Sequence, residues 1–200
     1  MRQTPLKTSL AAALVAVSLL AGTSAWALEY EEPRTQDERS RVIDRLIAER
    51  DYQTALKELE IGLEINPANA QFKFKRAVLH ARLGHVERAR VLFEDMITAY
   101  PEIVEPYNNL AALYAQEGEY TKAKKLLERA VTINPNFAMG FENLGDLTLA
   151  MNPRAKTQAS EYYRQALAIT PNDKRIAAKL SDLSKWLIEP FSLLKDIQCL

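Results

Sequence analysis

Few side chains in this sequence combine the residue type and the spacing that a chemical reaction requires. The lone cysteine, Cys199, cannot form an internal disulfide or a CxxC redox pair, so it is either an ordinary exposed thiol or half of an interchain disulfide. Neither His80 nor His85 has a second His, a Cys or a carboxylate at the spacing of a metal site, and we expect them at the edge of the core and in a turn. GxSxG, HExxH and phosphate-binding glycine loops are missing. The sequence therefore predicts a protein that is not an enzyme and has no cofactor or metal site.

Four prolines divide the chain at a nearly constant interval. Pro67, Pro101, Pro135 and Pro171 are separated by 34, 34 and 36 residues. A period in this range is typical of a solenoid of stacked units. Because proline lacks a backbone N–H and clashes with the preceding turn, each of these residues is expected to end a helix.

The residues between the prolines resemble the tetratricopeptide repeat, whose pattern runs from an aromatic, Leu-Gly and Tyr to Ala, an aromatic and Pro. The central copy has Tyr107, Leu110, Ala111 and Tyr114, then Ala123, Leu127, Ala130 and Pro135; the next has Phe141, Leu144, Gly145 and Thr148, then Ala159, Tyr163, Ala166 and Pro171. The two earlier copies are looser, with Arg76 where Leu is usual. The resemblance covers residues 36–173 and implies an all-α, right-handed α-solenoid of four helix-turn-helix units plus a C-terminal capping helix.

The chain is expected to divide into a series of segments. Four repeats cover 36–69, 70–103, 104–137 and 138–173, with helix pairs at about 37–49 and 52–65, 70–83 and 86–99, 104–117 and 120–133, and 138–151 and 156–169. The two extra residues of the last interval are placed in the turn Met151–Lys156. A capping helix at 174–188 has Ile176, Leu180, Leu183 and Leu187 on one face, and residues 189–200 form an apolar tail.

The first 27 residues have the pattern of a cleavable signal peptide. Arg2 and Lys7 precede an apolar run from Leu10 to Ala21, and Ala25-Trp26-Ala27 fits signal peptidase. We expect cleavage after Ala27, a flexible lead-in at 28–35, and a periplasmic or secreted protein. An uncleaved, membrane-anchored form is the alternative, although the apolar run is shorter than the ~20 residues that span a bilayer.

Charge gives little indication of nucleic-acid binding. The chain has 26 basic and 26 acidic side chains, and removing residues 1–27 leaves 24 and 26. Because neither a strong net charge nor a basic stripe is present, nucleic acid is not an expected partner.

The resemblance implies that the first helices of the repeats line a concave groove in which a protein or an extended peptide binds. The candidate binding residues, taken from helical phase, are Phe74, Lys75, Arg82, Asn108, Asn109, Met139, Glu142, Asn143 and Asp146. Asn109 and Asn143 share one phase, where an Asn in this family commonly holds the main chain of a peptide; the alternative is two ordinary solvated amides.

The Lys and Arg cluster with which some members grip a C-terminal carboxylate is missing. The groove instead runs from basic at Lys75 and Arg82 to acidic at Glu142 and Asp146, which suggests a ligand of mixed polarity with apolar contacts to Phe74 and Met139.

The expected function is therefore that of a protein–protein interaction scaffold or adaptor of the bacterial cell envelope. The alternative is a structural subunit that self-associates through its end helix and apolar tail, giving a homo-oligomer. Mutations would act in the groove in the first case and at 186–200 in the second, and the size in solution of a variant ending near Glu189 would distinguish them.

Overall fold

The computed structural model describes residues 35–192, apart from the side chains of Ser184 and of residues 186–192. The expected signal peptide, residues 28–34 of the lead-in, the Trp186 side chain, Cys199 and the rest of the tail lie outside the described residues.

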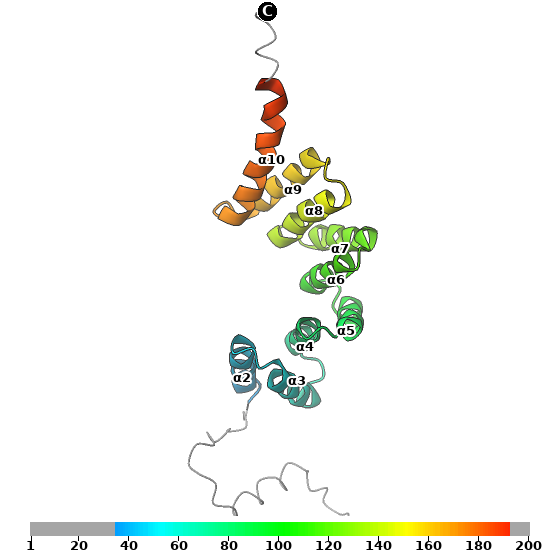
Figure 1. Cartoon of the computed structure of the whole chain (residues 1–200). Helices are drawn as coiled ribbons and strands as arrows, with labels where there is room; N and C mark the ends of the chain where they lie inside the picture. The colour runs from blue at the N-terminus through cyan, green and yellow to red at the C-terminus, as the bar shows by residue number, and fades with distance from the viewer. Residues whose placement is uncertain (1–34, 193–200) are drawn as a thin grey trace, which may run out of the picture.

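The described residues form helices and no strand (Figure 1). Each of the eight paired helices begins and ends within one residue of the bounds expected from the sequence. The pairs are α2 (Gln36–Ala48) with α3 (Tyr52–Ile65), α4 (Ala70–Arg82) with α5 (Val86–Ala99), α6 (Glu105–Gln116) with α7 (Tyr120–Ile133), and α8 (Ala138–Met151) with α9 (Lys156–Ile169), followed by α10 (Lys174–Ser192). The chain is thus an all-α solenoid of helix-turn-helix units with a ninth described helix at its end.

The backbone explains where the second helices stop. The residues before the four prolines have φ between −138° and −124° and ψ between 64° and 95°, which lies outside the helical region; they are Asn66, Tyr100, Asn134 and Thr170. A residue that precedes proline is pushed out of the helical conformation by contact with the proline ring. The nearly constant spacing of the prolines therefore sets the length of each unit.

Small residues allow the helices of each unit to approach closely. The six alanines at these positions have an exposed fraction of 1% or less: Ala55, Ala77, Ala89, Ala111, Ala123 and Ala159. At the equivalent position in α8, Gly145 lies against the ring of Tyr163, and a Cβ added there would overlap that ring. A larger side chain at any of these positions would push the two helices of the unit apart.

The two extra residues of the last interval are divided between a helix and a turn. α6 ends at Gln116, so an interval of 34 residues would end α8 at Ala150. Instead, α8 ends one residue later, at Met151, and the connection to α9 is one residue longer than the connections within the other hairpins. The side chain of Asn152 accepts a hydrogen bond from the backbone N–H of Arg154 (3.0 Å), which stabilises this longer turn.

The last helix, α10, packs on the end of the stack. Its backbone N–H groups at Arg175 and Ile176 bond the side chain of Asp173, which caps the helix. Ile176 and Leu183 are buried in a cluster with Tyr163 and Ala166 of α9. α10 continues through Pro190 to Ser192, so it includes the first residues of the segment expected to be a tail.

Candidate functional site

The first helices of the units form the inner side of the bend. Figure 1 shows α4, α6 and α8 along this side and α5 and α7 along the outer side. The groove is the inner surface formed by these first helices together with α10.

One position recurs in α4, α6, α8 and α10, and in three of these four helices its side chain contacts the preceding first helix. Lys75, Asn109, Asn143 and Lys179 occupy this position, at intervals of 34, 34 and 36 residues. The Nζ of Lys75 donates to Asp44 Oδ1 (2.6 Å) and Ser40 Oγ (3.4 Å) of α2. The Nδ2 of Asn143 donates to Asn108 Oδ1 of α6 at 2.6 Å. Polar contacts of this kind thus join α2 to α4 and α6 to α8.

Asn109 is the exception. The residues of α4 at the positions that Asn109 would contact are Phe74 and Val78, which offer no polar atom. Its Nδ2 donates instead to the carbonyl oxygen of Glu105, one turn earlier in the same helix (2.8 Å), and its Oδ1 accepts no hydrogen bond from the described residues. The two asparagines with the same phase therefore differ: Asn143 is held by α6, and Asn109 keeps a free acceptor.

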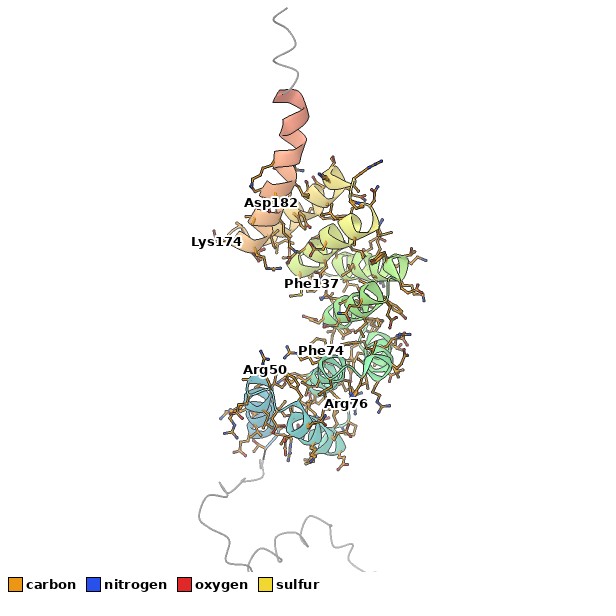
Figure 2. The ribbon with its side chains drawn as sticks, viewed as in Figure 1. Arg50, Phe74, Arg76, Phe137, Lys174 and Asp182 are labelled. Carbon is orange, nitrogen blue, oxygen red and sulfur yellow. The ribbon has the colours of Figure 1, made fainter. Side chains whose placement is uncertain are left out.

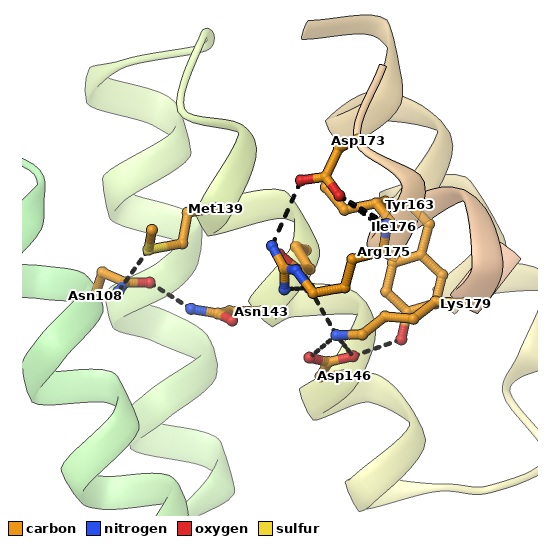
Figure 3. A network of polar contacts seen from close by, with 10 residues as sticks. Asn108, Met139, Asn143, Asp146, Tyr163, Asp173, Arg175, Ile176 and Lys179 are labelled. Carbon is orange, nitrogen blue, oxygen red and sulfur yellow. Dashed lines mark hydrogen bonds and ion pairs between the residues drawn. The ribbon is translucent and has the colours of Figure 1, made fainter. Parts of the chain in front are cut away.

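At the far end of the groove, Arg175 and Lys179 of α10 lie against the two acidic candidates, of which Glu142 is buried and Asp146 exposed; Figure 3 labels Asp146 and the two cations. Glu142 has an exposed fraction of only 2% and pairs with both Arg175 and Lys179 of α10. Lys179 Nζ also lies 2.6 Å from Asp146 Oδ2, and the hydroxyl of Tyr163 donates to Asp146 Oδ1 at 2.7 Å. The acidic end that the sequence predicts for the groove is therefore paired with the cations of the last helix.

The charges in this network hold their partners in defined protonation states. Burial, followed by the hydrogen bond to Asp146, raises the pKa of the Tyr163 phenol well above its usual range. Burial acts to lower the pKa of Lys179, but its hydrogen bonds to Asp146 and Glu142 outweigh burial and raise it. Lys179 is therefore charged at neutral pH, and Tyr163 is a neutral donor.

A cavity of about 390 Å³ lies between α6, α7 and α8. Its walls are mostly alanine and leucine, with amides at the rim; the lining residues are Asn108, Ala111, Ala112, Ala115, Gln116, Tyr120, Leu127, Asn143, Asp146, Leu147 and Ala150. Three of the candidates selected from helical phase, Asn108, Asn143 and Asp146, thus lie at one hollow. A second cavity of about 290 Å³, between α4, α5 and the start of α6, includes Phe74.

Matches to known families agree with this geometry. Residues 43–102 and residues 104–137 each match a family model described as tetratricopeptide repeat. The chain contains tetratricopeptide repeats. Such repeats are protein–protein interaction modules, so the chain is an interaction scaffold, and proteins built of them are generally not enzymes.

Solved structures with tetratricopeptide repeats share the fold at low sequence identity. PilF of Pseudomonas aeruginosa is 23% identical over 77% of this chain and 69% of its own, with a TM-score of 0.68. A thermophilic TPR protein of Thermus thermophilus is 24% identical over 76% of this chain and 83% of its own, with a TM-score of 0.62. The first TPR of Spaghetti (RPAP3), bound to the HSP90 peptide SRMEEVD, is 19% identical over 59% of this chain and 92% of its own, with a TM-score of 0.53. No curated protein sequence matches the chain significantly.

The remaining candidates lie along the groove of the repeats. Phe74, on α4 (Figure 2), packs against Phe93 with 6.2 Å between the ring centroids. Met139 has an exposed fraction of 53%, and its Sδ accepts a hydrogen bond from Asn108 Nδ2 at 3.5 Å. Arg82 is exposed, with its guanidinium 5.8 Å from the centroid of Tyr52. Lys75 is paired with α2, so among the two basic candidates only Arg82 has its charge free for a ligand.

Sequence reasoning missed two features of these repeats. Arg175 and Lys179 were not among the groove candidates, although continuing the interval of 36 residues from Asn143 leads to Lys179. The second feature is a histidine pair: the turn after α4 brings His80 Nδ1 within 3.2 Å of His85 Nδ1, a contact that was not predicted from the sequence. Burial, then His85, Arg88 and Arg76, lower the pKa of His80, so this imidazole is neutral at pH 7.

The described residues lack a metal-binding cluster and a membrane-spanning helix. They contain no group of three or more His, Cys, Asp and Glu side chains that could hold a metal ion. Within 35–192, the helices are either too short or too polar to cross a membrane.

Proposed function

We propose that this protein is a non-enzymatic adaptor of the bacterial cell envelope that binds a peptide segment or a partner protein in the groove of its first helices. The observation that carries the proposal is the cavity of about 390 Å³ between α6 and α8, which is lined by small apolar side chains and rimmed by amides. Pockets with apolar walls and a few placed polar groups are the usual form of a binding site. The structure of a TPR with an HSP90 peptide supports the choice of a peptide as ligand.

The N-terminal 27 residues support the assignment to the envelope. A basic start, an apolar run and a small-x-small cleavage site together direct export. Sequencing the N-terminus of the protein purified from an envelope fraction tests this part separately. A chain beginning at Leu28 is expected, and a chain retaining residues 1–27 in a soluble cytoplasmic fraction would contradict it.

The adaptor proposal is tested by blocking the cavity. Ala112 is exposed and lies in the cavity wall, so Ala112→Arg fills the groove without entering the core. Ala168→Arg, at an exposed position of α9, is the matched control. Affinity capture from an envelope extract should retain a partner with the wild type and the control and lose it with Ala112→Arg.

Two other results would contradict groove binding. A partner retained equally by all three proteins would place the site on another surface. Capture of this chain alone, with a dimeric or larger size in solution, would favour the self-associating subunit instead.

A further inference from the structure

The cavity between α6 and α8 has no free charge on its walls. Of its lining residues, only Asp146 has an acidic or basic side chain, and its carboxylate is held by Lys179 and Tyr163. The neighbouring carboxylate, Glu142, is buried and paired with Arg175 and Lys179. A charged side chain entering this cavity would lose its hydration without gaining an ion pair, which is unfavourable.

The cavity exists because three side chains are smaller than their counterparts one repeat earlier. Where α6 has Asn108 and Ala112, α4 has Phe74 and Val78, and where α7 has Leu127, α5 has Phe93. In the earlier repeat, Phe74 lies beside Phe93, with 6.2 Å between the ring centroids, and both Phe74 and Val78 pack in the apolar cluster that contains Phe93. The hollow is therefore a feature of this pair of repeats and does not follow from the repeat pattern.

The rim offers hydrogen bonds suited to a peptide main chain. Gln116 lines the cavity and is exposed at the end of α6; Asn109, one turn before Ala112 on the same helix, has an Oδ1 that accepts no hydrogen bond from the described residues. A side-chain amide both donates and accepts, as a peptide unit does. The Asn108–Asn143 hydrogen bond between α6 and α8 holds the two walls in place.

We propose that this cavity binds one large uncharged side chain, such as Leu, Ile, Met or Phe, from an extended partner segment. The inference rests on the proposed groove-binding function and adds the chemistry of the ligand. Because the site has no unpaired charge, binding depends little on salt. The mixed-polarity ligand expected from the sequence is replaced by a neutral, apolar one.

The test uses the full chain labelled with ¹⁵N and short capped peptides of Gly and Ser that carry one central Phe, Leu, Ser, Glu or Lys. The Phe and Leu peptides are expected to shift the amide signals of Ala111, Ala112, Ala115 and Ala150, and to bind about tenfold more tightly than the Ser peptide. Their affinity should change less than about twofold between roughly 50 mM and 500 mM salt.

A filled cavity provides the matched variant. Ala112→Val introduces the residue that α4 has at this position, and should weaken binding of the Phe peptide about tenfold. Ala168→Val on α9 makes the same change in helix propensity outside the groove and should leave the affinity unchanged.

Each contrary result has a separate meaning. Binding of the Glu or Lys peptide in the groove as tight as that of the Phe peptide, a steep salt dependence, or an unchanged affinity in Ala112→Val would overturn the apolar ligand and leave groove binding intact. If no peptide shifted the signals of α6 and α8, this inference would fail; the Ala112→Arg capture then decides separately whether the groove binds a protein.

Discussion

At the scale of single residues, one backbone position in the turn of each of the first three hairpins determines its geometry. Arg50, Gly84 and Gly118 follow one another at intervals of 34 residues and have φ of 63°, 78° and 79° (Arg50 is labelled in Figure 2). Glycine adopts this left-handed conformation without penalty, whereas a residue with a Cβ pays roughly 1–2 kcal/mol. A Cβ added at Gly84 or Gly118 would meet no atom within 4 Å, so the preference comes from the backbone alone.

Arg50→Gly is therefore expected to raise the free energy of unfolding by about 0.5–1 kcal/mol, the relief of strain less the greater chain entropy of glycine when unfolded. Gly118→Ala should lower it by about 1 kcal/mol. Urea titration followed by circular dichroism measures both. Arg50→Ala is the control, because it removes the charge and keeps the strained backbone, and its stability should stay close to that of the wild type. A loss of stability in Arg50→Gly would show that the Arg50 side chain matters more than the backbone.

At the scale of helices, α10 acts as the first helix of a further unit. Its Lys179 occupies the position of Lys75 and Asn143, and like them it reaches back to the preceding first helix. This contact and the ion pair of Arg175 with Glu142 offset the charges of Glu142 and Asp146. The last helix therefore does more than cover apolar surface: it determines the charge of the groove.

Lys179→Met tests this coupling, because it keeps most of the side-chain stem and removes the ammonium group. Asp146 would lose its cation and Glu142 one of two, so the free energy of unfolding should fall by about 1–3 kcal/mol. Hydrogen exchange should quicken in α10 before it does so in α6. Lys174→Met, at an exposed residue of the same helix, is the control and should have little effect. Equal exchange rates in the two variants would mean that apolar contacts alone hold α10.

The sequence predicted the helices far better than it predicted the state of the groove. Proline spacing and helical phase are local properties, and they placed the helix ends within a residue and the candidates on one surface. Whether a candidate is free depends on the residue that faces it from the next helix. Asn109 and Asn143 look equivalent in the sequence, but one faces Phe74 and the other Asn108. Glu142 has the phase of a solvent-facing residue, yet it is buried because Arg175 and Lys179 cover it. These facing pairs are separated by more than 30 residues, and periodicity alone does not reveal them.

At the scale of the whole molecule, the helices pack in sequence order. Backbone contacts between described helices are made chiefly by consecutive pairs, from α2 with α3 to α9 with α10. The apolar core is correspondingly divided into separate clusters along the stack. In such an array, stability is nearly the sum of the stabilities of the units and of the interfaces between neighbours.

Truncating one buried isoleucine at each end should therefore destabilise only that end. Ile176→Ala, in the cluster of α9 and α10, and Ile43→Ala, in the cluster of α2 and α3, remove side chains with exposed fractions of 1% and 0%. Each should cost about 2–5 kcal/mol locally, through lost burial and the cavity that remains. Hydrogen exchange resolved by segment should quicken from α8 to α10 in the first variant and from α2 to α4 in the second, with α6 and α7 protected in both.

The two variants serve as controls for each other, because the same substitution is made at opposite ends. An equal loss of protection along the whole chain would show that the repeats unfold as one cooperative unit. The cavity between α6 and α8 would then depend on both ends of the stack, because unfolding of either end would also unfold α6 to α8.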